Sequence, residues 1–118
     1  MQVWRKEAAQ FQPATGGIFR GTVNAHRMVG EQHSKQVTAA LISFAPGGRN
    51  IFHTHTFDQV LYITEGEGIV ATEQEEIVVR AGDLVIIPAG EKHWHGATPT
   101  TAMSHLAIGA PGRTEAAE

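Results

Sequence analysis

Two histidines one residue apart, His53 and His55, open the segment HTHTFDQVLYITEGEG, and Gln59 follows four residues after the second. Alternate side chains of a β-strand point to the same face, so these imidazoles would lie about 7 Å apart along one side of the strand. Two neutral imidazoles in this arrangement can converge on one small ligand, such as a metal ion. An isolated pair of this kind also occurs among surface and hydrogen-bonded histidines, so the rest of the chain decides between the two interpretations.

The elements that must position these side chains are predicted to be β-strands. No segment has a sustained helical period, whereas short β-rich runs recur between turn sequences such as APGG, EGEG, RAGD and PAGEK. Regular spacing of such runs is typical of an antiparallel sandwich or barrel, so the predicted fold class is all-β. We expect strands at residues 18–29, 36–45, 50–56, 59–66, 67–74, 75–81, 83–89, 93–99 and 101–109.

The length of 118 residues, with 42% hydrophobic content, suits one domain over residues 1–118 with its core at about 18–109. Residues 110–118 lack an apolar anchor, so we expect a loose C-terminal tail. The runs VLYI and LVII are apolar at both parities instead of alternating. Strands covered on both faces would follow, which in a small barrel predicts a homodimer or homotetramer.

The composition argues against several classes of function. The chain has no cysteine, so a metal would be bound by His, Gln, Asp, Glu or water. A net charge of -3 without a basic stripe argues against nucleic acid as a partner. The segment MQVWRKEAAQ is charged where a signal peptide is apolar, and no apolar stretch approaches about 18 residues. We therefore expect a cytoplasmic protein with no membrane partner, acting on a small molecule.

Glycines and a proline frame the histidines at fixed spacing. The first frame reads G-x5-H-x-H-x3-Q-x6-G over residues 47–66, and the second reads G-x5-P-x-G-x2-H over residues 82–93. These frames resemble the two motifs of the cupin superfamily, which usually has Glu at the position of Gln59 and Asn at that of Ala97. With their spacer, the motifs cover residues 47–97. The resemblance implies a small single-domain cupin, which is an antiparallel double-sheet jelly-roll barrel.

The resemblance to cupins also implies one divalent transition metal per chain, bound by His53, His55, Gln59 and His93. Three imidazoles and an amide oxygen suit manganese, iron, nickel, cobalt or zinc. Because none of these ligands is anionic, a bound ion would keep its double positive charge, which favours Lewis-acid chemistry over oxygen activation. The alternative is a cupin that has lost its metal, with Gln59 as the mark of that loss.

Three further side chains lie close to the motif residues along the chain. His95 follows His93 at strand spacing, so it is expected to be a hydrogen-bond partner of the site, a residue at its rim or a further ligand. Trp94, between them, is expected to pack outward at a subunit contact or to form a wall of the pocket. His105 shares a strand face with Met103, either as a satisfied core residue or as a neutral proton acceptor. Around the metal or in the adjoining pocket we place His95, Met103, Ala40 and Ile42.

Three segments sharpen the resemblance: FRGTV at 19–23, FAPGGRNIFHTHTFDQ at 44–59 and GEKHWHGATPTTAMSHLAIG at 90–109. They are similar to the bacterial cupin-type hydroxynitrile lyases, which use manganese, carry the same Gln ligand and cleave cyanohydrins to an aldehyde and cyanide. The resemblance implies manganese as the metal and His105 as the catalytic base. A Gln that those lyases carry four residues beyond the base is Gly109 here.

Three functions stay open at this point. The first is a metal-dependent lyase acting on cyanohydrins or related hydroxy and carbonyl compounds. The second is an iron or nickel dioxygenase or isomerase, as many cupins are, and the third is a binding module without turnover. The acidic segment EGEGIVATEQEEIVVR is interpreted as a solvated hairpin, and His26 and His33 as surface residues.

Overall fold

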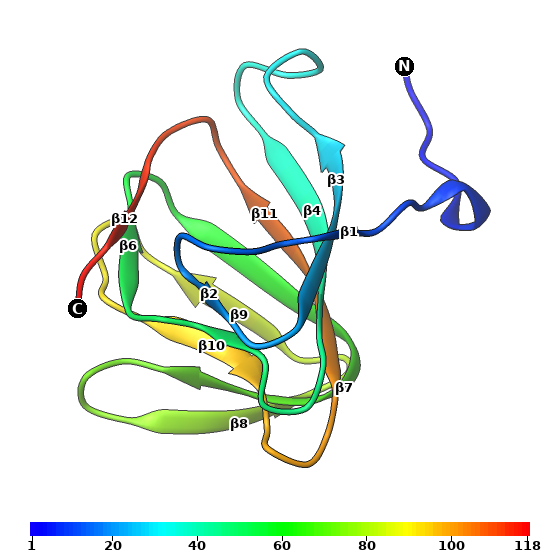
Figure 1. The fold of residues 1–118 in the computed structure, drawn as a ribbon. Helices are drawn as coiled ribbons and strands as arrows, with labels where there is room; N and C mark the ends of the chain where they lie inside the picture. Colours follow the sequence, from blue (N-terminus) through cyan, green and yellow to red (C-terminus); the bar gives the residue numbers. More distant parts are fainter.

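The computed structural model describes all 118 residues, and nearly all of its regular structure is β-strand (Figure 1). The single helix is a short 3-10 turn, η1 (Lys6–Ala8), and no helix is long and apolar enough to cross a membrane. The strands are β1 (Gln12–Pro13), β2 (Phe19–Arg20), β3 (Val23–Val29), β4 (Thr38–Phe44), β5 (Arg49–Asn50), β6 (His53–His55), β7 (Gln59–Ala71), β8 (Glu76–Arg80), β9 (Leu84–Ile87), β10 (Trp94–Ala97), β11 (Met103–Gly109) and β12 (Thr114–Ala116).

The long strand β7 is shared by two antiparallel layers. Its first half pairs with β11 and β9 in the layer β1-β3-β4-β11-β7-β9, and its second half pairs with β10 and β8 in the layer β2-β5-β10-β7-β8. The two layers curl over one another, and β6 with β12 lies beside one open end (Figure 1). The prediction of an all-β, antiparallel double-sheet jelly roll is confirmed.

A glycine bulge, and not a turn, lies at the sequence EGEG. The prediction of separate strands at 59–66 and 67–74 is wrong, because β7 runs through Gly66 without a break. Gly66 has a φ of 76°, and the register between β11 and β7 shifts between Ser104 and His105. Glycine tolerates the positive φ that such a bulge requires, and the bulge bends the strand so that it serves both layers. A bend at Gly21, with a φ of 75°, similarly divides the predicted strand 18–29 into β2 and β3.

The C-terminal segment is not loose, and this prediction is wrong. Its strand β12 pairs with β6, with Thr114 opposite His55 and Ala116 opposite His53. The backbone N–H groups of Thr56 and Ala117 complete this pairing by donating to Arg113 O at 3.0 Å and Phe52 O at 2.9 Å. Backbone hydrogen bonds need no apolar side chain, so the composition of the tail did not reveal the strand. At the other end of the chain, β1 extends the sheet before residue 18.

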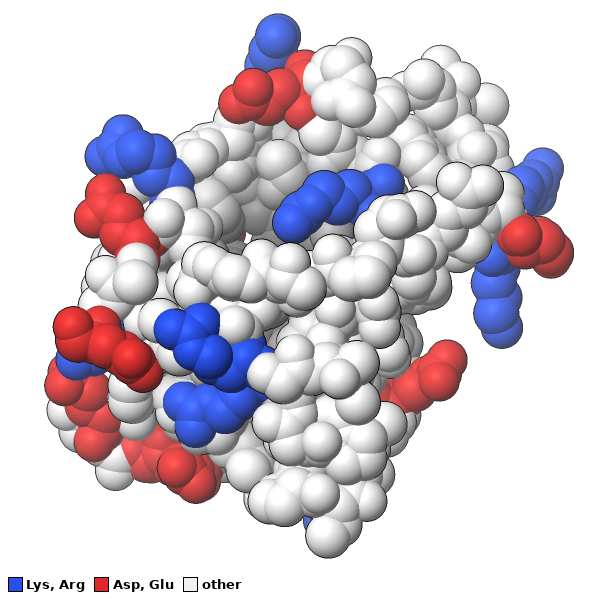
Figure 2. Space-filling model, viewed as in Figure 1, with Lys and Arg blue, Asp and Glu red and all other residues white.

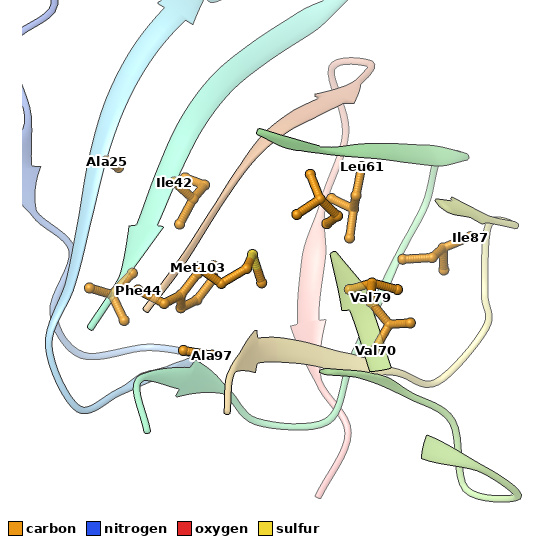
Figure 3. Close-up of a cluster of buried hydrophobic side chains, with 11 residues drawn as sticks. Ala25, Ile42, Phe44, Leu61, Val70, Val79, Ile87, Ala97 and Met103 are labelled. Carbon is orange, nitrogen blue, oxygen red and sulfur yellow. The ribbon is translucent and has the colours of Figure 1, made fainter. Parts of the chain in front are cut away.

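The core fills the space between the two layers (Figure 3). It follows from the alternation of β7, where Leu61 and Ile63 are fully buried while Tyr62 between them is exposed. Phe44 from β4 and Met103 from β11 pack into the same cluster. The remaining members are Val23, Ala25, Ile42, Val70, Val79, Ile87 and Ala97.

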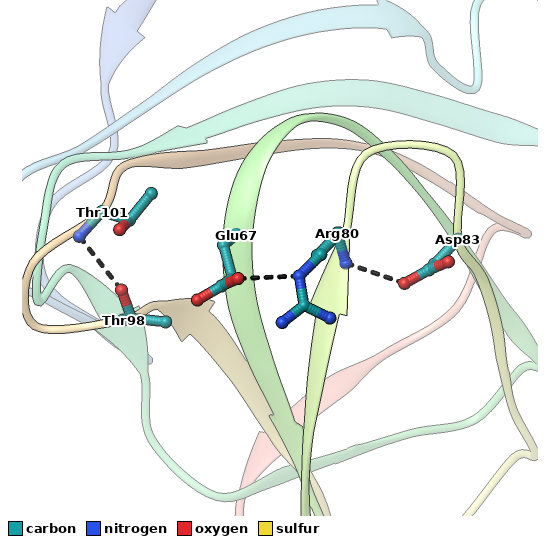
Figure 4. Close-up of polar contacts among 5 residues, drawn as sticks. All are labelled: Glu67, Arg80, Asp83, Thr98 and Thr101. Atoms are coloured by element: carbon teal, nitrogen blue, oxygen red, sulfur yellow. Dashed lines mark hydrogen bonds and ion pairs between the residues drawn. The ribbon is translucent and has the colours of Figure 1, made fainter.

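The acidic hairpin of β7 and β8 is held by exposed polar contacts (Figure 4). Arg80 Nε lies 2.9 Å from Glu67 Oε2 across the two strands, and the Arg80 N–H donates to Asp83 Oδ2 at 2.8 Å in the turn that follows. An exposed ion pair of this kind stabilises the fold by less than about 1 kcal/mol. The hairpin therefore keeps an edge of the sheet hydrated and contributes little to the core.

Gly66 and Gly47 offer a matched pair for testing the bulge, because their φ values are 76° and 79°. A Cβ at Gly66 would overlap the Ala102 carbonyl oxygen, whereas a Cβ at Gly47 would meet no atom within 4 Å. We expect Gly47→Ala to cost about 1 kcal/mol of stability, from backbone strain alone, and Gly66→Ala about 3 kcal/mol or more. Urea unfolding measures both, and equal losses in the two variants would contradict the bulge contact.

The outer face of the first layer carries an apolar patch. Leu84 is 63% exposed, Ile86 is 59% exposed and Tyr62 is 43% exposed, and Leu84 pairs with Tyr62 and Ile86 with Val60 across β9 and β7. A contiguous apolar surface of this kind is typical of a protein interface. We propose that a second copy of the chain covers it in a homodimer.

A charge placed in this apolar patch should separate the two copies. Ile86→Lys should reduce the mass measured by light scattering from that of a dimer to that of a monomer, because the lysine would lose its hydration in the interface. Ile77→Lys on β8, where Ile77 is 47% exposed in the second layer, is the control and should remain dimeric. A parent chain that is monomeric at micromolar concentration would contradict the proposal.

Candidate metal centre

Three buried histidines meet at the open end of the barrel. His53 and His55 come from β6 and His93 from the residue before β10, and their donor atoms lie within 4.8 Å of one another. The rings of His53 and His93 are 4.2 Å apart, and the His53 and His55 rings 4.8 Å apart, between centroids. The backbones of His53 and His93 exchange two hydrogen bonds, of 2.9 and 3.1 Å. This pairing brings together two segments that are 40 residues apart in the sequence.

Backbone carbonyl groups fix the orientation of two of these rings. His53 Nδ1 lies 2.7 Å from Ile51 O, and His93 Nδ1 lies 2.8 Å from Glu91 O. A carbonyl oxygen only accepts, so each Nδ1 carries the proton and donates it, which leaves the Nε2 lone pair free. His93 Nε2 is buried without any partner. A buried nitrogen with a free lone pair in this position is suited to binding a metal ion.

His55 and Gln59 complete the set from two directions. His55 Nδ1 lies 2.8 Å from Thr114 Oγ1 on β12, and its Nε2 lies 3.1 Å from Gln59 Oε1 at the start of β7. When Nδ1 carries the proton and donates it to Thr114, the Nε2 and Oε1 atoms turn lone pairs toward each other, and a cation between them satisfies both. Phe57 stacks on the His55 ring at 4.8 Å. The structure thus brings together all four predicted ligands.

Burial keeps these imidazoles neutral. It lowers the pKa of His53 and of His55 to about 4, and it also lowers the pKa of His93, with the nearby imidazoles adding to the effect on His53 and His55. Metal binding requires unprotonated nitrogen, so these ligands need to lose no proton at pH 7. Three neutral imidazoles and one amide oxygen fit a divalent transition metal, and the residues present therefore suit the group that the motif implies.

A second pair of histidines lies behind the first group. His105, fully buried on β11, has its Nε2 3.0 Å from His95 Nδ1 on β10. The His95 ring centroid lies 4.9 Å from that of His105, 5.6 Å from that of His93 and 5.7 Å from that of His53, so it links the pair to the group of three. Burial lowers the pKa of His105 to about 4 and holds that of His95 well below its ordinary value. His105 Nδ1 has no partner.

Asn50 is a site residue that the sequence did not reveal. It is 2% exposed on β5, its Oδ1 accepts the backbone N–H of His95 at 2.8 Å, and its Nδ2 lies 3.4 Å from His95 Nδ1. Thr114 was missed as well, because it lies in the segment predicted to be loose. Neither residue belongs to a recognisable spacing pattern, and only the pairing of β5 with β10 and of β12 with β6 places them here.

A cavity of about 690 Å³ opens on the group of ligands. His53, His55 and Gln59 line it, together with the predicted pocket residues Ala40 and Ile42. Figure 2 shows a hollow on this face, with white atoms over most of its edge and a Lys or Arg side chain beside it. The cavity is therefore a largely uncharged space beside the metal ligands, of a size typical for small-molecule sites.

The other predicted pocket residues lie elsewhere. Met103, 1% exposed, packs in the apolar core and does not line the cavity. Trp94 is 6% exposed, with the Arg49 guanidinium 3.6 Å above its ring on the face of β10 opposite His95, so its own chain covers it. His33 is exposed, as predicted for a surface residue, but it lines the cavity mouth.

Gly109, which takes the place of a Gln in the resembling lyases, also lines the cavity. A Cβ at this position would lie 2.6 Å from Phe57 Cε2. The Phe57 ring that stacks on His55 thus occupies the space that a larger side chain at residue 109 would need.

Comparison with known proteins agrees with this geometry. The family model described as a cupin domain matches residues 40–109, which is more than half of the chain. The chain belongs to the cupin family. An (R)-mandelonitrile lyase from Granulicella tundricola is 43% identical over 91 residues, covering 76% of this chain and 70% of the relative.

More distant relatives have other activities or none stated. An acireductone dioxygenase from Parasynechococcus marenigrum is 36% identical over 58 residues, covering 46% of this chain, and the chain spans only 31% of that relative. A solved cupin-like protein from Thermotoga maritima superposes with a TM-score of 0.84 at 28% identity, over 89% of this chain and 83% of that one. A polyketide cyclase from Streptomyces resistomycificus superposes with a TM-score of 0.88 at 14% identity, over 100% of this chain and 86% of that one, and shows the fold alone.

Metal content should depend on His55 and on the strand that orients it. We expect His55→Ala to lose most of the bound divalent metal, and Thr114→Val to bind it about 10- to 100-fold more weakly, because the ring loses the partner of its Nδ1. Elemental analysis and competition with a chelator measure both effects. Glu115→Gln, an exposed change on the same strand, is the control and should bind metal like the parent. Full metal occupancy in His55→Ala would place the ligands elsewhere.

Stability of the metal-free chain should fall as the pH is lowered from about 6.5 to about 4. The unfolded chain binds protons at the ordinary histidine pKa of 6.5, whereas burial holds the folded pKa of His53, His55 and His105 at about 4. Unfolding therefore takes up protons in this window, and acid shifts the equilibrium toward the unfolded chain. Urea midpoints measured at intervals of pH should show this fall, with a smaller slope in His105→Phe. A flat profile would contradict the burial of neutral imidazoles.

Proposed function

We propose that the protein is a metal-dependent lyase that cleaves or forms the C–C bond of cyanohydrins or related hydroxy and carbonyl compounds. The observation that carries the proposal is a set of four neutral donors, His53, His55, Gln59 and His93, beside a largely uncharged cavity and backed by a buried imidazole pair. The 43% identity to an (R)-mandelonitrile lyase supports the same reaction class. Manganese is the ion we propose, with iron, nickel, cobalt and zinc as the alternatives that the same donors accept.

The charge of the donor set favours Lewis-acid chemistry. When bound, a divalent ion supplies electrophilic stabilisation to a hydroxyl or carbonyl oxygen beside it. Because Gln59 contributes an amide oxygen and no negative charge, the ligands neutralise none of that charge. A carboxylate at residue 59 would neutralise part of it and weaken the polarisation of the substrate. Gln59 is thus the residue that favours a lyase over redox chemistry.

The pair His95 and His105 provides the proton acceptor. Both rings are buried and neutral at pH 7, and the 3.0 Å bond between them places one proton between two nitrogens. His95 lies between the group of three and His105, so a proton leaving the substrate hydroxyl reaches His105 through His95. The O–H electron pair becomes the carbonyl bond, the C–C bond breaks, and cyanide leaves with that bond's electron pair and takes back the proton from the imidazole pair as hydrogen cyanide. Asn50 holds His95 in place.

The cavity walls position the organic part of the substrate. Ala40, Ile42 and Ala107 line the cavity on the β4 and β11 side, and His53 and His55 line it from β6. Apolar walls exclude water from the reacting carbon and favour an aryl or alkyl group.

A dioxygenase is the second candidate, and the acireductone dioxygenase relative favours it. That reaction requires oxygen consumption with an enediol substrate, and the lyase reaction does not. Oxygen uptake by the purified, metal-loaded chain therefore separates the two candidates.

The decisive experiment is a mandelonitrile cleavage assay with and without a chelator, in which the absorbance of the benzaldehyde product measures the rate. We expect cleavage that the chelator abolishes. His105→Ala should keep its metal and lose about 10²- to 10⁴-fold in rate, because the proton acceptor is gone. Gln59→Glu should also keep its metal but turn over more slowly, because the carboxylate offsets the charge of the ion.

Metal content measured on the same preparations is the control for each variant. If Gln59→Glu and His105→Ala both cleave cyanohydrins as fast as the parent, the lyase mechanism is wrong. Oxygen uptake with an enediol would then favour the dioxygenase, and a bound metal with neither activity would favour a binding module.

A further inference from the structure

A single arginine interrupts the apolar inner face of β3. Val23 and Ala25 on this strand are buried in the core, and strand alternation turns Arg27 to the same inner face. Arg27 pairs with Ala40 on β4, and Ala40 pairs with Ala107 on β11; both alanines line the cavity. Side chains directly opposite each other in an antiparallel pair share a face. Arg27 is exposed to solvent, and it is also one of the residues that line the cavity, so its guanidinium lies where the cavity meets the surface.

Arg27 has no ionic partner in the chain. The three ion pairs of the structure are formed by Arg80, Lys92 and Arg113. Arg27 is the one Lys or Arg among the residues that line the cavity, and Glu31 is the one carboxylate. Glu31 does not come within ion-pair distance of Arg27. The residues that line the cavity thus include a guanidinium without an ionic partner and the neutral donors His53, His55 and Gln59.

The spacing of the strands makes one ligand accessible to both groups. Arg27 lies three strands from β7, which begins at Gln59, or about 14 Å across the sheet, and a guanidinium extends several ångströms from its backbone. The cavity volume of about 690 Å³ is larger than a reacting hydroxyl and its carbon atom require. The same substrate can therefore carry a second functional group that reaches Arg27. A guanidinium binds a carboxylate through two parallel N–H···O bonds.

We propose that the natural substrate is a hydroxy or carbonyl compound bearing a carboxylate, and that Arg27 binds this carboxylate. The inference rests on the proposed function, because it assigns the reacting oxygen to the metal ligands and the anionic group to Arg27. The neutral walls of Ala40, Ile42 and Ala107 hold the carbon skeleton between them. Arg27 is a specificity residue, since it lies apart from the reacting carbon.

Binding of inert analogues tests this assignment without turnover. The metal-loaded full chain is titrated by calorimetry with 3- and 4-(hydroxymethyl)benzoate and with benzyl alcohol, which lacks the carboxylate. Of the two benzoates, the one that the parent binds more tightly is used for the comparison. We expect Arg27→Gln to bind this benzoate about 10- to 100-fold more weakly than the parent does. Arg27→Gln should bind benzyl alcohol as tightly as the parent, and this unchanged binding would also show that the variant is folded. Arg27→Lys should retain part of the difference, because it keeps the charge but loses the paired bonds.

Lys35→Gln is the matched control, since Lys35 is exposed in the segment between β3 and β4, does not line the cavity and carries the same charge. It should bind both ligands like the parent. The inference is overturned if Arg27→Gln binds the benzoate as tightly as the parent does, or if it weakens benzyl alcohol equally. The parent could bind the benzoate through Arg27 and yet cleave neither mandelonitrile nor its carboxylate derivative. That result would support the role of Arg27 and would overturn only the lyase proposal.

Discussion

The burial of five imidazoles inside a chain of 118 residues is the constraint on which the rest of the structure depends. A buried polar ring destabilises the fold unless its nitrogen atoms find partners. Ile51 O, Glu91 O and Thr114 Oγ1 each take up one Nδ1, and the His95–His105 bond uses two more nitrogens. The Nε2 atoms of His53, His55 and His93 remain, in a group whose donor atoms lie within 4.8 Å of one another, and His105 Nδ1 stays without a partner. The need to satisfy the outer nitrogens is thus what leaves the inner ones free for an ion.

The strand β6 connects the buried histidines to the rest of the barrel. Its three residues include two of the candidate ligands, His53 and His55, and it is held on one side by β12 and on the other by the backbone of His93. The end of the chain therefore forms part of the centre, because Thr114 orients His55 from β12. A strand of three residues would not be stable by itself, and it keeps its place only through these neighbours.

The two layers have separate tasks. The β3-β4-β11 side supplies cavity-lining residues, among them Arg27, and the buried His105, and the layer of β5 and β10 supplies Asn50 and His95, with His93 just before β10. The bulge at Gly66 lets β7 join both layers, and Gln59 at its first residue completes the ligand group. The cavity is lined both by the donor-bearing residues His53, His55 and Gln59 and by the wall residues of β4 and β11.

Local spacing determined the class of the fold, and the resemblance of that spacing to the cupin motifs gave the candidate ligands that the structure brings together. His53 and His55 share a strand face whatever the strand pairs with, and the glycine frames around them are typical of a cupin. Only the tertiary structure decided that β12 is a strand, that EGEG is a bulge, that Met103 lies in the core and that Asn50 and Thr114 hold two of the histidines. These facts depend on which strands pair across long stretches of chain, and pairing is set by backbone hydrogen bonds and packing that no single segment encodes.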